Sequence, residues 1–122
     1  MLAPIPNYLS TGELAQRQAA IFAALGDETR LSIVTKLSVG RPYSIAKLTE
    51  GTPLTRQAVT KHLRVLEGAG IVRSIRLGRE SLFALDPAPF AEMKEYLDFV
   101  STQWDNALSR LKAFVEAPEA GR

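Results

Sequence analysis

Cysteine is absent from this sequence of 122 residues, and histidine occurs once, at His62. Without thiols the chain has no disulfide framework, no thiolate metal site and no thiol redox chemistry. One imidazole cannot hold a transition-metal ion by itself, so we expect no metal site and no cofactor. The lack of cysteine also agrees with a cytoplasmic location.

Long apolar runs and catalytic motifs are lacking as well. The longest apolar segment, residues 19–26, is far shorter than the roughly 20 residues that cross a bilayer. The first residues show no basic stretch followed by an apolar run, so we expect no signal peptide, no membrane contact and a cytoplasmic protein. There is no glycine-rich phosphate loop. The stretch Gly68-Ala69-Gly70 is typical of a helix C-terminus and not of a dinucleotide-binding motif. We therefore predict that the protein is not an enzyme.

The positive charge is concentrated in one segment of the chain. The whole sequence carries a net charge of +2, with 46% hydrophobic residues, which is typical of a globular domain. Residues 41–80 hold eight Lys and Arg against three Glu, a net charge of +5, whereas the rest of the chain carries −3. Such a distribution is the electrostatic signature of a surface that binds a polyanion such as DNA.

The segment SIAKLTEGTPLTRQAVTKHLRVLEGAG, residues 44–70, predicts a helix-turn-helix. Ser44 can cap a short first helix, and Gly51-Thr52-Pro53-Leu54 ends it. Thr55 can cap a second helix, whose Ala58, Val59, Leu63 and Leu66 have the spacing of a buried stripe. The other side is cationic: it could be an ordinary solvated face, or it could supply donors to bases and phosphates.

The flanking segments complete a mainly α fold with a small β-hairpin, in the order α-α-α-α-β-β-α. The pattern predicts an irregular arm over residues 1–9, one domain over residues 10–116 and a frayed tail over residues 117–122. Two helices, residues 11–25 and 28–38, precede the helix-turn-helix, and Asp27 can cap the second of them. Two strands, residues 71–77 and 80–85, are joined by a two-residue turn with Gly78 first.

That hairpin carries Arg73, Arg76 and Arg79. Directly after a helix-turn-helix, such a hairpin is interpreted as the wing of a winged helix, although arginines on edge strands can also simply prevent aggregation. The DNA-binding residues that we predict lie on the two helices and the wing: Ser44, Thr55, Arg56, Gln57, Thr60, Lys61, His62, Arg64, Arg73, Arg76 and Arg79. We expect His62 to be either structural or directed at a phosphate.

The last predicted helix, from about residue 88 to residue 116, is longer than a domain of this size needs for its own core. Its apolar residues follow steps of three and four, which favours a seam between two helices. The stripe could pack on its own subunit, but we predict a twofold dimer that also uses the first helix. The predicted interface residues are Leu14, Ile21, Phe90, Met93, Leu97, Val100, Trp104, Leu108 and Leu111.

Three stretches of sequence resemble the ArsR-type winged-helix transcriptional regulators: ALGDETRLSIVTKL (24–37), LTRQAVTKHLRVLEGAGIV (54–72) and RSIRLGRESLFALD (73–86). The resemblance covers about residues 18–115. It implies a homodimeric repressor that binds an inverted-repeat operator, with Thr55 to Gly68 as recognition helix and Arg73 to Leu85 as wing. An inducer normally lowers DNA affinity in this family. The alternative is a winged helix that only binds other proteins.

The chain departs from the metal-sensing members of that family. Where these carry a cysteine motif, the present chain reads Ile45-Ala46-Lys47-Leu48-Thr49, and its last helix has Asp98 and Asp105 but no histidine. The resemblance thus implies a member without metal-sensing motifs. Some such members respond to a small organic effector and others have no known one. The aromatic side chains of the last helix could line a ligand pocket or pack in the core.

Overall fold

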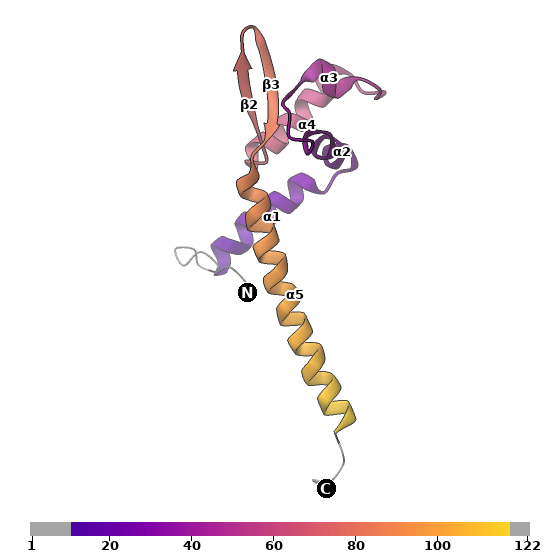
Figure 1. Ribbon diagram of the computed structural model, residues 1–122, viewed down its shortest axis with the longest axis vertical. Coiled ribbons are helices and arrows are strands. Elements are labelled where there is room, and N and C mark those ends of the chain that lie inside the picture. The colour runs from indigo at the N-terminus through magenta and orange to yellow at the C-terminus, as the bar shows by residue number, and fades with distance from the viewer. Residues whose placement is uncertain (1–10, 118–122) are drawn as a thin grey trace.

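The computed structural model describes residues 11–117, which form five helices and three short strands (Figure 1). The order confirms the mainly α, winged helix-turn-helix fold with a long last helix. The predicted arm, residues 1–9, and residues 118–122 of the predicted tail lie outside the described residues. The elements are α1 (Thr11–Leu25), α2 (Glu28–Leu37), β1 (Tyr43–Ser44), α3 (Ile45–Thr49), α4 (Arg56–Gly68), β2 (Val72–Leu77), β3 (Glu80–Leu85) and α5 (Pro87–Glu116).

Side-chain caps set the start of four helices. The carboxylate of Asp27 accepts a hydrogen bond from the backbone N–H of Arg30 at 3.0 Å, which satisfies a free donor in the first turn of α2. Asp86 does the same for α5, and Pro87 follows it in the first turn, where its missing N–H costs nothing. Helix α2 ends at Leu37, one residue earlier than predicted, because Ser38 forms the C-cap.

The sheet has three strands in the order β1-β3-β2, all antiparallel, rather than the two strands of the predicted hairpin. The added strand, β1, pairs Tyr43 with Phe83 and Ser44 with Leu82. It anchors the connector before α3 to the middle of β3. The β2–β3 turn is the predicted one: Leu77 pairs with Glu80, and Gly78 has a φ of +64°.

The core lies where α1, α2, α3 and α4 meet the base of the sheet and the start of α5 (Figure 1). Its largest fully buried side chains come from α2, α3, α4 and the entry to β2. They are Leu37, Leu48, Val59, Leu63, Leu66, Ile71 and Val72. The platform under α4 is therefore apolar and close-packed, which fixes the orientation of that helix.

Helix α5 leaves this body after its first turns. Over its length of 30 residues, about 45 Å at 1.5 Å per residue, its buried residues are Pro89 and Met93. Helix α1 crosses it, where Arg17 pairs with Glu92 at 2.8 Å and the rings of Phe22 and Tyr96 lie 6.1 Å apart. Beyond that crossing, α5 projects alone from the rest of the subunit (Figure 1).

Candidate nucleic-acid interface

Helix α4 presents a polar face directly opposite its buried stripe. Gln57, Lys61 and Arg64 are exposed, and each lies two positions before one of the buried residues Val59, Leu63 and Leu66. Two positions correspond to about 200° around an α-helix, so the two triplets lie on opposite sides. The outward face thus carries an amide and two cations, which are the groups that bind adenine edges, guanine edges and phosphates.

One flank of α4 faces the wing. Arg56, Thr60 and Glu67 share this flank, and a carboxylate oxygen of Glu67 accepts a hydrogen bond from the hydroxyl of Ser74 in β2 at 3.1 Å. The hydroxyl of Thr60 donates to the backbone carbonyl of Arg56 at 2.7 Å, whereas the Arg56 side chain is exposed. The contact between Glu67 and Ser74 holds the hairpin beside α4.

Two of the predicted DNA-binding hydroxyls act as helix caps. The Ser44 hydroxyl accepts from the backbone N–H of Lys47 at 3.1 Å, at the start of α3. The Thr55 hydroxyl accepts from the backbone N–H of Ala58 at 3.1 Å, at the start of α4. Both side chains therefore have a structural role that is worth about 1 kcal/mol each by the usual cost of removing a cap.

His62 lies on the other flank of α4, away from the outward face. Its Nδ1 is 3.3 Å from a guanidinium nitrogen of Arg30 and 3.8 Å from a carboxylate oxygen of Asp27. His62 was expected either to be structural or to face a phosphate, and these contacts match the structural role. Arg30 also donates from Nε to the carbonyl of Ala24, the last turn of α1, at 2.5 Å. We call Asp27, Arg30 and His62 the junction cluster.

The carboxyl of Asp27 is the charged acceptor in the junction cluster. Its pKa lies below its ordinary value, chiefly because the backbone N–H of Arg30 donates to the carboxylate, and the Arg30 charge adds to this effect. Sequence reasoning recognised the cap but missed the contact with His62, since residues 27 and 62 are far apart along the chain. Nothing in the local pattern signals this pairing.

The three wing arginines do not share one face. Neighbouring residues of a strand point to opposite sides of the sheet, so Arg76 shares the face of Ser74, toward α4, while Arg73 lies on the other face. Arg79 occupies the second position of the turn, at the tip. All three side chains are exposed. The structure thus brings Arg76 to the side of α4 and separates Arg73 from it.

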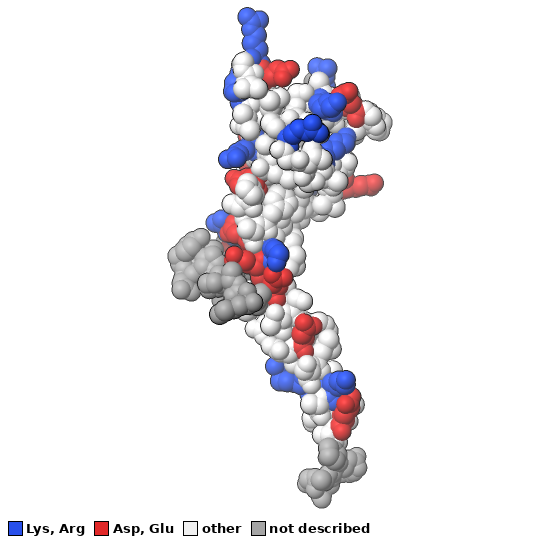
Figure 2. All heavy atoms as spheres, viewed as in Figure 1, with Lys and Arg blue, Asp and Glu red and all other residues white. Residues whose placement is uncertain are grey.

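The basic residues that are concentrated in residues 41–80 of the sequence lie on the surface of the molecule. All eight Lys and Arg side chains of residues 41–80 are exposed. Figure 2 shows Lys and Arg, with some Asp and Glu among them, around the end of the molecule that contains the hairpin, α3 and α4, and side chains of both signs along α5. Lys and Arg at this end form a positive surface that attracts phosphates.

The predicted interface residues fall into two groups. Ile21 and Met93 are buried inside the subunit, and Leu14 and Phe90 are half-buried. The remaining five lie on the projecting part of α5 with 42–62% of their surface exposed: Leu97, Val100, Trp104, Leu108 and Leu111. Among residues 11–117 of one subunit, no element covers this apolar stripe.

Among residues 11–117, no group of three or more His, Asp or Glu side chains is arranged to hold a metal ion. Asp98, one of the two acids considered on the last helix, forms an ion pair with Lys94 at 3.0 Å. None of the helices formed by these residues is both long and apolar enough to cross a membrane.

Comparisons with known proteins agree with this geometry. A family model described as a helix-turn-helix domain matches residues 25–75. The HTH-type transcriptional regulator Rv2034 of Mycobacterium tuberculosis is 33% identical over 94 residues, which cover 77% of this chain and 84% of that protein. An ArsR-like transcriptional regulator from Rhodococcus sp. RHA1 has 34% identity and a TM-score of 0.76, covering 85% of this chain and 97% of that one.

A more distant structure shares the fold. The homodimeric winged helix-turn-helix DNA-binding domain of Mb0332 from Mycobacterium bovis has 19% identity and a TM-score of 0.62, and the match covers 81% of this chain and 92% of that one.

Proposed function

This chain belongs to the ArsR-type winged helix-turn-helix transcriptional regulators, which bind DNA and are not enzymes, and we propose that it acts as a homodimeric repressor. Its operator is an inverted repeat, and each half-site is read by α4 of one subunit with the wing beside it. A DNA-binding regulator has to reach the genome, so the cytoplasmic location is part of the proposal.

The outward face of α4 is the observation that carries the proposal. Gln57, Lys61 and Arg64 point away from the core on a helix whose opposite side is locked into it. A recognition helix has to combine such a rigid platform with free hydrogen-bonding side chains. A winged helix used only for protein contacts has no need of this cationic face, nor of the positive surface around it.

Different residues supply sequence preference and general affinity. Arg56, Gln57, Thr60 and Lys61 lie in the first two turns of α4, and N-terminal residues of a recognition helix contact base edges. We assign base readout to these four, with neighbouring phosphates as their other contacts. Arg64, Arg76 and Arg79 mainly bind phosphates, which contributes affinity for any sequence, whereas Arg73, also predicted as DNA-binding, lies on the other face of the sheet and is left out of this assignment.

Dimerisation through α5 is supported by its uncovered apolar stripe. Leu97, Val100, Trp104, Leu108 and Leu111 follow steps of three and four along the projecting helix. A second copy of the chain would cover this stripe with the same residues, since twofold interfaces are self-complementary. The homodimeric state of the Mycobacterium bovis domain agrees with this arrangement.

The regulatory signal is, in our proposal, a small organic molecule. The chain has no cysteine and one histidine, and the imidazole of His62 is engaged with Arg30. Metal sensing needs several such ligands in one place. Binding of the effector is expected to lower the affinity for the operator, which would release the promoter.

Selection of bound sequences from random duplex DNA tests the proposed readout. The purified protein should enrich an inverted repeat, and Gln57→Ala should relax preference at one base pair in each half-site, by about 5- to 100-fold for a lost bidentate contact. Gln103→Ala, an exposed amide on α5, is the matched control and should change nothing. An unchanged preference in the double variant Arg56→Ala/Gln57→Ala would contradict base readout by this helix. Absence of any binding to random duplex DNA at low salt would favour the protein-interaction module.

The single tryptophan reports on the dimer interface. Trp104 is 62% exposed in the subunit, so its emission should shift to shorter wavelength in the dimer and back on dilution. Leu108→Glu should yield monomers in sedimentation equilibrium, because it places two charges in an apolar seam. Ser109→Glu, on the next residue and another side of the helix, should leave the dimer intact. Dimeric Leu108→Glu protein would argue against this interface.

A further inference from the structure

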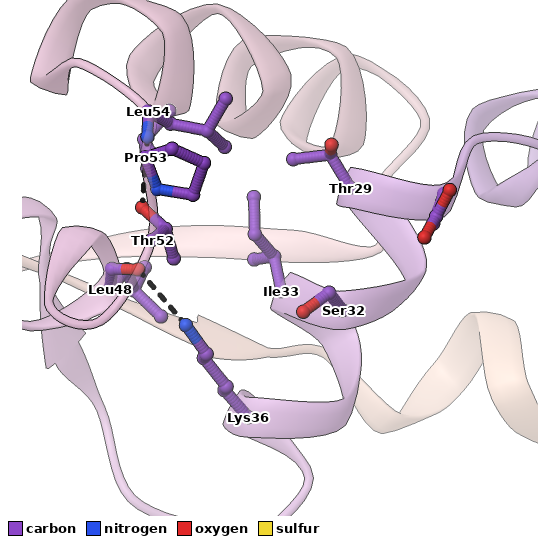
Figure 3. A pocket seen from close by; sticks show the side chains of 10 residues that line it. Thr29, Ser32, Ile33, Lys36, Leu48, Thr52, Pro53 and Leu54 are labelled. Atoms are coloured by element: carbon purple, nitrogen blue, oxygen red, sulfur yellow. Dashed lines mark hydrogen bonds between the residues drawn. The ribbon is translucent and has the colours of Figure 1, made fainter.

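A cavity of about 220 Å³ lies between α2 and the turn that joins α3 to α4 (Figure 3). One side is a single face of α2, formed by Thr29, Ser32, Ile33 and Lys36 at positions i, i+3, i+4 and i+7. The opposite side is the turn segment Thr52-Pro53-Leu54 together with Leu48 of α3. The cavity is therefore bounded by the helix-turn-helix itself on one side.

Its inner surface is apolar and rigid. Ile33, Leu48 and Val59 belong to the buried core, with at most 3% of their surface exposed. Thr52 fixes the turn, because its hydroxyl donates to the carbonyl of Thr49 at 2.8 Å and accepts from the N–H of Leu54 at 3.3 Å. The wall is thus held by the fold and does not depend on a ligand to form.

Lys36 and Ser32 place an ammonium and a hydroxyl on neighbouring turns of the α2 wall. The ammonium of Lys36 donates to the carbonyl of Leu48 at 3.2 Å, across the cavity in Figure 3, and an ammonium has two further N–H donors. The hydroxyl of Ser32, one helical turn away, makes no hydrogen bond within residues 11–117. Glu28, the one acidic residue of the lining, lies four positions from Ser32 and eight from Lys36, about 6 Å and 12 Å along the helix axis. The Lys36 end therefore favours an anion.

We propose that this cavity binds a small organic carboxylate, with the carboxylate at Lys36 and Ser32 and an apolar body against Ile33, Leu54 and Pro53. A few polar groups that orient a ligand over an apolar wall are typical of small-molecule sites. Cavities of about 150 Å³ can hold benzene, so 220 Å³ is sufficient for one aromatic ring or a six-carbon chain with its carboxylate.

This site deepens the proposed function and rests on it, since the ligand is placed as the effector of the DNA-binding protein. Leu54 precedes Thr55, the cap residue of α4, and α2 also touches α4 through the contact of Arg30 with His62. The ligand has to bind more tightly to an arrangement in which α2 and the turn stand farther apart, and this preference changes the position of α4 relative to α2. Operator affinity should fall by at least about 5-fold, and DNA should weaken ligand binding by the same factor.

Methyl NMR of the full chain without DNA tests the site directly. Titration with sodium benzoate or sodium hexanoate should shift the methyl signals of Ile33, Leu48 and Leu54, with benzyl alcohol and hexanol as neutral controls. Lys36→Met keeps an unbranched side chain, one atom shorter and without the charge, and should weaken carboxylate binding about 10-fold or more, while the alcohols bind as before. Lys94→Met, on exposed α5, is the matched control.

A second variant covers the case in which Lys36→Met disturbs the turn. Ser32 is exposed on the rim, so Ser32→Phe fills the cavity without replacing a core residue; it should abolish carboxylate binding and retain DNA binding. The site is refuted if neither carboxylate at 10 mM shifts these methyl signals, or if Lys36→Met binds carboxylates unchanged. Ligand binding without any change in operator affinity refutes the effector role, and a protein that never binds DNA refutes the proposed function while the NMR result stands.

Discussion

The opposite orientations of Arg73 and Arg76 on one strand lead to a sharp prediction about the wing. Arg76 lies on the sheet face of Ser74, whose hydroxyl contacts Glu67 of α4, whereas Arg73 lies on the other face. Both are exposed arginines of β2, so Arg73→Ala and Arg76→Ala remove the same group at two sites that differ mainly in orientation. Only Arg76 should contact the DNA that α4 engages.

The magnitude follows from counterion release. Each phosphate contact contributes about 0.9 to the slope of log affinity against log salt, and a dimer with two wings loses two contacts, so Arg76→Ala should flatten the slope by about 1.8. Between 50 mM and 200 mM salt the variant should therefore lose about 10-fold less affinity than the unmodified protein does. Arg73→Ala should leave the slope unchanged.

Fluorescence anisotropy with a labelled random duplex, at four salt concentrations across that range, measures the slope without any knowledge of the operator. Circular dichroism and thermal unfolding of both variants confirm that the hairpin is retained. An equal change of slope in the two variants would refute the argument from strand orientation. A slope that neither variant alters would remove the wing from the interface.

Three further predictions concern the framework. Leu63→Ala should destabilise the fold by about 2–5 kcal/mol in urea unfolding, because Leu63 is fully buried beneath α4. Gly78→Ala should cost about 1–2 kcal/mol in the same assay, since φ is +64° there although the added Cβ meets no atom within 4 Å. The lowered pKa of Asp27 means that the unfolded chain binds its proton more tightly, so this contribution to stability is complete above about pH 4 and is lost as the pH falls further. Asp27→Asn keeps a capping side chain and should remove that part of the acid dependence in unfolding measured from pH 6 to pH 3.

Local signals in the sequence predicted most of the fold. Asp27, Ser44 and Thr55 are caps in the structure as expected, and each marks a helix boundary to within a residue. These predictions succeed because a cap or a two-residue turn depends on a few neighbouring residues. Gly78 likewise determines the register of the hairpin, because it marks the first position of the two-residue turn between Leu77 and Glu80.

Features that depend on distant residues were not predictable. Strand β1 has two residues, too few for any periodicity, and it exists because Tyr43 meets Phe83, 40 positions later. The junction cluster and the cavity under the turn arise in the same way, from side chains that α2 presents to another element. The burial of Ile21 and Met93 within the subunit depends on how α1 crosses α5, which periodicity does not specify.

Helix α2 is short, but it contacts three other helices: α1, α3 and α4. Through Arg30 it contacts the last turn of α1 and His62 of α4, and through Lys36 it contacts the carbonyl of Leu48 in α3. Helix α1 in turn packs on α5, which carries the proposed dimer interface. A shift of α2 therefore changes the support of the recognition helix at its flank and at the turn before it, while the outward side chains of α4 remain free. Because these contacts involve side chains at the two ends of one rigid helix, any ligand that moves α2 would alter both.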